Sequence, residues 1–301
     1  MGLPHDRSHL LWTNAPTARF IQSIDRWTKA LIDDDPSAEI STQRNRAIAR
    51  IIAKGPGILA GQPVLNHLFS KYCQNYHMTW NFSEGDEFKV GDVILTIEAD
   101  GAEILTVERT AMNLITRMSG IATNTSRWTE TLNQVAIAAT RKTIWGVLDK
   151  WAVHTGGGLT HRIDRSDAPM IKENDIALSN LSLTEQISNA TLNSDFVVVE
   201  VVSIEHALSV ARVWKNSIQK NNKIEPLTLL IDNLGPEGSY DVANQLENEG
   251  LRDGLVLEGS GGVQMNELVR WANSGMDVIS SGALTMKSPP IDMTMLVEVD
   301  G

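Results

Sequence analysis

The spacing of hydrophobic residues divides the chain into two parts that favour different secondary structure. In the first part, apolar positions at helical spacing predict helices over residues 17–33, 61–73 and 106–133. Alternating apolar positions over 49–61 predict strands interrupted by Gly55-Pro56-Gly57. Two apolar runs in residues 90–105, joined at Ala99-Asp100-Gly101, predict a β-hairpin. This first part is therefore expected to be α+β.

From about residue 134 to 282, short apolar runs alternate with amphipathic segments. The runs are VAIAAT, APMIK, FVVVEV, LTLLID, GLVLE and DVIS. Such continuous apolar runs are typical of parallel strands that are buried on both faces. The alternation predicts a β/α barrel, with a doubly wound sheet as the alternative. The tail over 288–299 is too short for another βα unit and is expected to add a strand to the first domain.

The long predicted helix over 106–133 contains three small residues, Ser119, Gly120 and Ala122. Small side chains allow a neighbouring segment to approach a helix closely, so close packing is expected there. A domain boundary is expected near the start of this helix.

Composition narrows the class of partner. The chain has 301 residues and a formal net charge of −11, which argues against nucleic acid or an anionic membrane as the partner. Cys73 is the single cysteine, so an intrachain disulfide is excluded, and its apolar surroundings predict a buried structural thiol. The N-terminus lacks the pattern of a signal peptide, and no apolar run has the length of a membrane span. A cytoplasmic location is therefore expected.

Against this acidic background, residues 139–175 form a cationic cluster. It contains Arg141, Lys142, His161, Arg162 and Lys172. A focused cationic cluster on an acidic protein indicates a site for a small anion. Arg141-Lys142, Lys172 and four further groups fall at or near the C-terminal ends of different predicted strands: Glu200, Asp232, Gly259–Gly262 and Ser281-Gly282. In a β/α barrel that end carries the active site.

Two glycine-containing loops and two carboxylates suggest what the anion is. The loops GSGG and SSGA have the composition of phosphate-binding turns, although each alone could be a plain βα turn. Glu200 and Asp232 need a cationic partner if they are buried. They could pair with the cationic cluster and only position it, or they could hold Mg²⁺ or a hydroxyl-rich substrate.

Eight motifs in the same order resemble one known family. They are ERTAMNLITRMSGIAT (108–123), TRKT (140–143), GGGLTHR (156–162), IKEND (171–175), VEVVS (199–203), LIDN (230–233), LEGSGGV (257–263) and SSGALT (280–285). Together they resemble the quinolinate phosphoribosyltransferases, also called nicotinate-nucleotide pyrophosphorylases (carboxylating), which act in de novo NAD biosynthesis.

The resemblance implies an architecture and an assembly. It implies an α/β class fold, with an N-terminal α/β sandwich domain over 1–111 plus 287–301. An open seven-stranded β/α barrel over 112–286 would be the catalytic domain, and the C-terminal tail would return to the first domain. Members form homodimers or dimer-based hexamers with shared active sites, and no nucleic acid or membrane partner is expected.

The resemblance also implies roles for individual residues. Quinolinate would be bound by Thr140, Arg141, His161, Arg162 and Lys172, with Arg109 reaching in from the partner subunit. Phosphoribosyl pyrophosphate would be bound by Lys142, Glu200, Asp232, Ser260, Gly261 and Gly282. Lys142, Glu200 and Asp232 would be the catalytic residues, and Mg²⁺ would be held by Glu200 and Asp232, directly or through water.

Departures from the family pattern leave two other functions open. The segment after TRKT reads Ile144-Trp145, and Met286 follows GALT where the family has histidine. Both changes reduce positive charge at the rim of the expected pocket. The alternatives are a phosphoribosyltransferase acting on nicotinate or another pyridine carboxylate, and a non-catalytic anion-binding paralogue.

Overall fold

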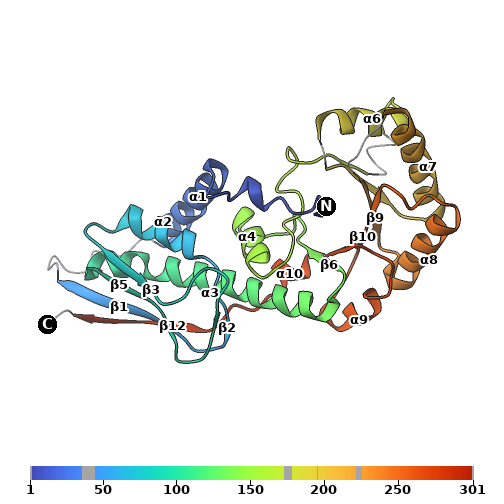
Figure 1. Cartoon of the computed structure of the whole chain (residues 1–301). Coiled ribbons are helices and arrows are strands. Elements are labelled where there is room, and N and C mark those ends of the chain that lie inside the picture. The colour runs from blue at the N-terminus through green and yellow to red at the C-terminus, as the bar shows by residue number, and fades with distance from the viewer. Residues whose placement is uncertain (1, 36–44, 173–177, 195, 222–225, 300–301) are drawn as a thin grey trace. The chain divides into compact units, whose positions relative to one another are not determined.

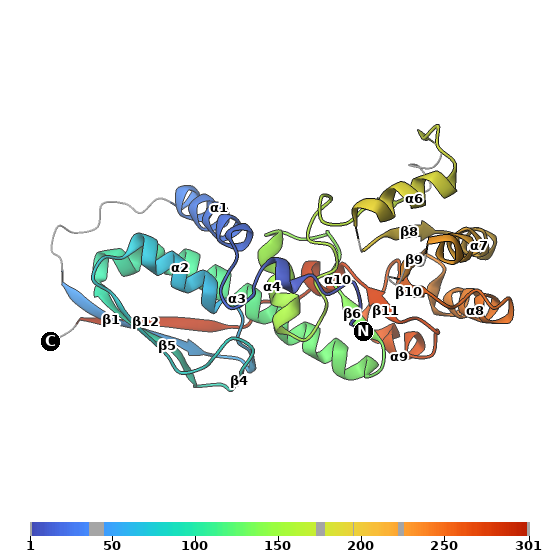
Figure 2. The same cartoon turned by 45° about the horizontal axis from the view of Figure 1, so that its top comes forward.

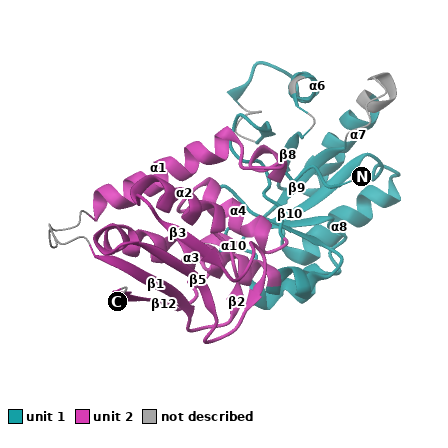
Figure 3. Ribbon diagram, turned by 60° about the vertical axis from the view of Figure 1, so that its left-hand side comes forward, with its two compact units in different colours: residues 1–7, 127–142, 158–283 teal, residues 8–126, 143–157, 284–301 magenta. Residues whose placement is uncertain are grey.

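The computed structural model describes the whole chain except residues 1, 36–44, 173–177, 195, 222–225 and 300–301. It separates into two compact units, which Figure 3 colours differently. Unit 1 contains residues 1–7, 127–142 and 158–283, and unit 2 contains residues 8–126, 143–157 and 284–301. The domain limits expected from the sequence, at residues 111 and 286, stay a prediction.

Unit 2 is built on a four-stranded antiparallel sheet (Figure 1). In spatial order its strands are β12 (Met293–Val299), β1 (Arg46–Ala53), β5 (Val93–Asp100) and β3 (His77–Trp80). The pairing places Val297 and Ile97 on either side of Ala49. The return of the C-terminal tail to the first part of the chain is therefore confirmed. A separate small ladder joins β2 (Gly57–Ile58) to β4 (Glu87–Phe88).

The helices of unit 2 follow from its apolar spacing, with one correction. They are α1 (Ala18–Asp34), α2 (Gln62–Tyr72), α3 (Gly101–Leu132, which continues into unit 1), α4 (Val147–Thr155) and the short η1 (Ser8–Leu10). The predicted hairpin over 90–105 is wrong, because β5 ends at Asp100 and α3 begins at Gly101. The Asp100 carboxylate accepts a hydrogen bond from the Ala102 amide, which favours a helix start at this point. Ile104 and Val107 are then buried at helical spacing.

The small residues of α3 pack closely against other segments of unit 2, as predicted. A Cβ atom on Gly120 would lie 2.1 Å from the Pro289 carbonyl oxygen. Ser119 accepts a hydrogen bond from the Ala60 amide at 3.2 Å. Cys73 is buried as expected, and burial, with a smaller effect of the Glu103 charge, raises the pKa of its thiol to about 12.

Unit 1 is a parallel sheet with helices outside it (Figures 1 and 2). In spatial order its strands are β6 (Ala136–Ala138), β11 (Val278–Ser280), β10 (Leu255–Ser260), β9 (Leu227–Asp232), β8 (Val198–Val201) and β7 (Met170–Ile171). Its helical segments are α6 (Leu183–Asn193), α7 (Ile204–Asn221), α8 (Gly235–Asn248), η2 (Met265–Glu267), α9 (Leu268–Trp271) and the start of α10 (Ala283–Met286). The capping box of Ser182 and Glu185 fixes the start of α6.

The expected open β/α barrel is found as six strands plus one bridge in the described part of the chain. A parallel bridge joins Leu159 to Ala138 and supplies the seventh position, beyond β6. Within the described residues, no ladder joins Leu159 to β7, so the sheet is open between them. None of the described helices combines the length and the apolar character that crossing a membrane requires.

Candidate active site

A cavity of about 390 Å³ opens among the C-terminal ends of the unit 1 strands. Its lining comes from β7, β8, β9, β10 and β11, from the residues that follow β6 and β7, and from the segment after Leu159. The lining residues are Thr140, Arg141, Lys142, His161, Arg162, Met170, Lys172, Glu200, Leu230, Asp232, Glu258, Ser260 and Ser280. Most of the residues predicted for the site are therefore brought together in one cavity, because parallel strands end at the same edge of the sheet.

The cationic side chains of this cavity are close enough to affect one another. Arg162 is buried, and its guanidinium donates to the Ala168 carbonyl at 3.0 Å and approaches the Met170 sulfur. Burial, and then the charges of Arg141 and Arg165, lower the pKa of Arg162 below its ordinary value. Such crowding of positive charge favours binding of an anion with more than one charge.

The two predicted carboxylates also lie in the cavity. Glu200 forms an ion pair with Lys172. Burial, and then the charge of Glu200, raise the pKa of Asp232 above its ordinary value, although Lys172 and Lys142 oppose the shift. Asp232 also accepts a hydrogen bond from the Asn233 side chain at 2.7 Å. Two carboxylates that repel each other in a partly buried cavity fit a divalent cation, which would relieve the repulsion.

The glycines predicted to contact phosphate border the same region. A Cβ atom on Gly282 would lie 2.9 Å from Cδ of Lys142, so the Lys142 side chain passes directly over this glycine. Gly261 has a φ of +101°, and a Cβ atom there would lie 2.4 Å from the Asn233 side-chain oxygen. At Gly261 the backbone nitrogen of Asn233 would also lie 2.6 Å from a Cβ atom, so only glycine fits there, whereas at Gly282 the Lys142 side chain would have to shift to admit one.

One part of the phosphate-loop hypothesis needs correction. The sequence VQMNELVRWANSG (263–275) predicts a helix after the GSGG loop, and the N-terminus of that helix would contribute its dipole. Strand β10 instead continues through Ser260, and the loop leads into η2 and the four-residue helix α9. Gln264, directly before η2, has an extended backbone, so no long helix begins directly after the loop.

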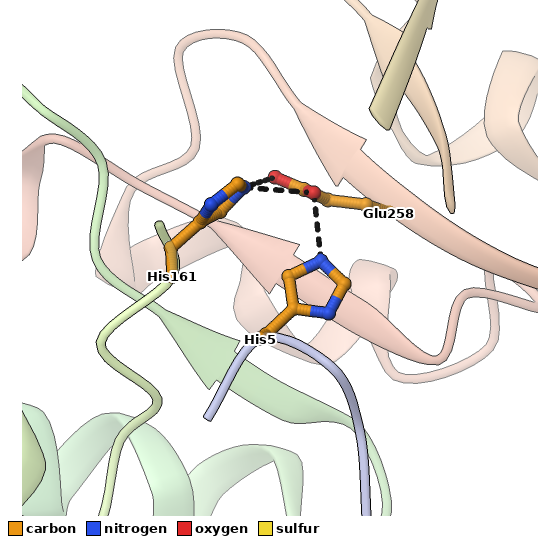
Figure 4. A group of neighbouring side chains, drawn as sticks. All are labelled: His5, His161 and Glu258. Carbon is orange, nitrogen blue, oxygen red and sulfur yellow. Dashed lines mark hydrogen bonds and ion pairs between the residues drawn. The ribbon is translucent and has the colours of Figure 1, made fainter. Parts of the chain in front are cut away.

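The sequence interpretation missed Glu258 and His5, which meet at the cavity. Glu258 is fully buried on β10, and Figure 4 shows the imidazole rings of His5 and His161 directed at its carboxylate. His5 Nε2 lies 2.9 Å from Oε2, and His161 Nε2 lies 3.0 Å from the same oxygen. Burial alone would raise the pKa of Glu258, but the attraction and hydrogen bond of His161, and then those of His5, lower it. The one sequence signal for Glu258 was a carboxylate near the end of a buried strand.

Arg109 stands apart from the residues that line the cavity. It lies on α3 in unit 2, and 66% of its side chain is exposed. Its nearest acidic neighbour is Glu108 at 3.9 Å. An exposed arginine in this position is available to another chain, and its contribution to a partner's site stays a prediction.

The arrangement is a cavity that brings cationic groups and carboxylates together at the C-terminal edge of a parallel β/α sheet, and comparisons with known proteins define the family. Residues 28–119 match the N-terminal domain of quinolinate phosphoribosyl transferase, and residues 121–296 match its C-terminal domain. The chain belongs to the quinolinate phosphoribosyltransferase family.

Relatives from distant organisms agree with this assignment. A probable nicotinate-nucleotide pyrophosphorylase (carboxylating) of Methanothermobacter thermautotrophicus is 33% identical over 280 residues, which cover 90% of this chain and 92% of the relative. A quinolinate phosphoribosyltransferase (decarboxylating) of Nicotiana glauca is 30% identical, over 84% of this chain and 74% of its own. The solved nicotinate-nucleotide pyrophosphorylase of Francisella tularensis superimposes with a TM-score of 0.79 at 27% identity, over 92% of this chain and 97% of that one.

Proposed function

We propose that this protein is a pentosyltransferase that transfers the phosphoribosyl group from phosphoribosyl pyrophosphate to quinolinate, with loss of CO₂. The products are nicotinate mononucleotide, CO₂ and pyrophosphate, so the reaction belongs to de novo NAD biosynthesis. The observation that carries this proposal is the single cavity in which Arg141, Arg162 and Lys172 face Glu200 and Asp232. Membership of the family supplies the reaction class.

The charges in the cavity suggest which part of the reaction each residue serves. Arg141, Arg162 and Lys172 would bind the two carboxylates of quinolinate, since an arginine guanidinium suits bidentate binding of a carboxylate. Lys142, beside Gly282, would bind the phosphoribosyl donor together with Ser260. To bind the substrate carboxylate, Lys172 would leave its ion pair with Glu200. The Glu200 carboxylate would then be released to interact with the ribose.

The chemistry then needs only positioning and electrostatic stabilisation. The lone pair of the pyridine nitrogen forms a bond to the anomeric carbon while the bond from that carbon to pyrophosphate breaks. Glu200 and Asp232 would stabilise the positive charge that develops on the ribose. The bond from the ring to the adjacent carboxylate then breaks, CO₂ leaves, and the ring carbon takes a proton.

Glu200 and Asp232 would also hold Mg²⁺, which is part of the same proposal. Their carboxylates are the ligands that Mg²⁺ prefers, and a bound cation would relieve the repulsion by which Glu200 raises the pKa of Asp232. When bound, Mg²⁺ neutralises charge on pyrophosphate.

The function is tested by product analysis. The protein is incubated with phosphoribosyl pyrophosphate, Mg²⁺ and either quinolinate or nicotinate, and nicotinate mononucleotide and CO₂ are measured. We expect both products from quinolinate, and we expect little or no product with Asp232→Asn, which keeps the side-chain shape and removes its charge. Product from nicotinate alone, without CO₂, would identify the enzyme as a nicotinate phosphoribosyltransferase. Absence of product from both acids would favour an anion-binding protein without catalysis.

A further inference from the structure

Residues 2–7 form an arm that belongs to unit 1 (Figure 3). The side chain of Leu3 packs against a core cluster of Ala138, Val256 and Val278, and His5 is fully buried. Arg7 donates from its guanidinium to Asp167 at 2.7 Å and from its amide to the Thr160 hydroxyl at 2.8 Å. The arm lies outside the residues that the family models match, so it adds to the family pattern in this chain.

The arm holds the segment that carries two predicted site residues, His161 and Arg162. At one end of that segment, Thr160 contacts the amide of Arg7. At the other end, Asp167 binds the Arg7 guanidinium and also accepts the Ile163 amide at 2.8 Å. Between them, His161 has a φ of +52°, a left-handed conformation that a residue other than glycine adopts at a cost. The segment therefore depends on surrounding contacts to stay in this shape.

His5 supplies the central contact of this arrangement through Glu258. The Glu258 carboxylate lies between the Nε2 atoms of His5 and His161 (Figure 4). The His5 ring also packs edge-on against His161, with 4.9 Å between ring centroids, and at the same distance from Phe196. Buried Nδ1 of His5 has no hydrogen-bond partner among the described residues. Burial of an unpaired polar atom is unfavourable. The contact between His5 Nε2 and Glu258 therefore forms at the cost of leaving Nδ1 buried without a partner.

The hydrogen bonds determine the tautomer of His161 and argue against a metal ion. The Arg162 amide donates to His161 Nδ1 at 2.7 Å, so Nδ1 carries no proton and Nε2 carries it. Nε2–H then donates to Glu258. A protonated Nε2 cannot bind a metal, although the three side chains are close enough together to form a ligand set. The group is thus a carboxylate with two imidazole donors.

We propose that His5 is a positioning residue of the quinolinate site, which rests on the function proposed above. By sharing Glu258 with His161, it fixes the His161 ring and the backbone that carries the Arg162 guanidinium. It also lowers the electrostatic repulsion between the Glu258 carboxylate and a dicarboxylate in the cavity. His5 acts through Glu258 and His161, and not through contact with the substrate.

Substitutions of His5 test this role. His5→Gln keeps a nitrogen donor close to the position of Nε2, whereas His5→Phe fills the space without a donor. We expect His5→Phe to raise the KM for quinolinate by about tenfold, roughly the value of one hydrogen bond to a charged group, with kcat within about twofold. We expect His5→Gln to stay within about threefold of the wild type for both constants. His9→Phe, at an exposed histidine four positions along, is the matched control and should change neither constant.

Two further measurements keep the test decisive. Arg7→Gln loosens the arm without altering the buried group, and it should raise the KM for quinolinate in the same direction if His5→Phe fails to fold. Nitrogen NMR of labelled histidine should show the Nε2–H tautomer of His161 in the wild type and in His5→Gln, and a mixture of tautomers in His5→Phe or Arg7→Gln. This readout needs no turnover, so it separates failure of the present proposal from failure of the proposed function.

Several results would overturn the role of His5. One is an unchanged KM for quinolinate in a folded His5→Phe variant, or in Arg7→Gln where His5→Phe does not fold. Another is equal loss in His5→Gln and His5→Phe, which would indicate a packing role alone. Stoichiometric zinc in the purified wild type would replace the hydrogen-bonded group with a metal centre.

Discussion

At the scale of single residues, two of the four non-glycine residues with positive φ in the described part of the chain lie beside residues of the cavity. His161 and Asn233 both have positive φ angles, and they directly adjoin Arg162 and Asp232. Residues other than glycine adopt this conformation when surrounding contacts require it. Neither angle could be predicted from the sequence, because histidine and asparagine give no local signal that distinguishes these positions from ordinary turns. Arg141, Lys172, Glu200 and Asp232 could be predicted, because each lies at or near the C-terminal end of an apolar strand.

Arg162 provides the prediction at this scale. Arg162→Lys keeps the positive charge but removes the planar pair of donors, so binding of a substrate carboxylate should weaken. We expect the KM for quinolinate to rise about thirtyfold, which corresponds to about 2 kcal/mol, while the KM for phosphoribosyl pyrophosphate changes little. Steady-state kinetics with each substrate varied in turn measures both constants.

Arg165→Lys is the control for this substitution. Arg165 lies in the same segment, is exposed, and contributes to the positive field around Arg162. It should leave both KM values within about twofold, since a surface charge is preserved. Equal effects of the two substitutions would show that net charge, and not the guanidinium shape of Arg162, binds the substrate.

At the scale of elements, periodicity predicted the regular segments and failed where a segment's path depends on distant contacts. The strands of unit 1 and the helices α1, α2 and α3 follow from apolar spacing. The hairpin over 90–105 failed because a single glycine can begin a helix as well as close a turn, and the Asp100 side chain decided between them. The sequence predicts only an irregular arm over residues 1–16, because the residues that Leu3, His5 and Arg7 contact in unit 1 lie more than 130 positions away in the sequence.

Gly120 provides the prediction at this scale. Gly120→Val would place its Cβ atom within 2.1 Å of the Pro289 carbonyl oxygen, so the tail before β12 would have to move away from α3. We expect a loss of about 3 kcal/mol in the free energy of unfolding, at the upper end for overpacking because the contact is with backbone. Chemical denaturation measures this loss. Gly55→Ala is the control, since its Cβ atom would meet only Ile291 at 3.8 Å and should cost less than about 1 kcal/mol. Equal stability of Gly120→Val and the wild type would show that the tail does not pack on α3 in solution.

At the scale of the whole molecule, the order of the strands brings the chemistry together. Thr140, Arg162, Lys172, Glu200, Asp232 and Ser260 are far apart in sequence but border one cavity, because every strand of unit 1 runs in the same direction. This convergence could be predicted from the alternation of strands and helices. Whether a second copy of the chain contributes to the site could not be predicted in this way, because an exposed arginine such as Arg109 has the same sequence signal whether or not it meets a partner. Only the family resemblance points to a shared site.

Mixing of two inactive variants tests whether sites are shared. If Arg109 completes the site of its partner, Arg109→Ala and Glu200→Ala should each abolish most of the activity. A mixed dimer would combine an intact Arg109 from one chain with an intact Glu200 from the other at one of its two sites. Random reassociation should therefore restore about a quarter of the wild-type kcat, since half of the dimers are mixed and each has one complete site. Arg127→Ala removes another exposed arginine of α3 and should stay active before and after mixing. Activity that stays at the level of the separate variants, in a sample whose subunits have been shown to exchange, would mean that each chain builds its site alone.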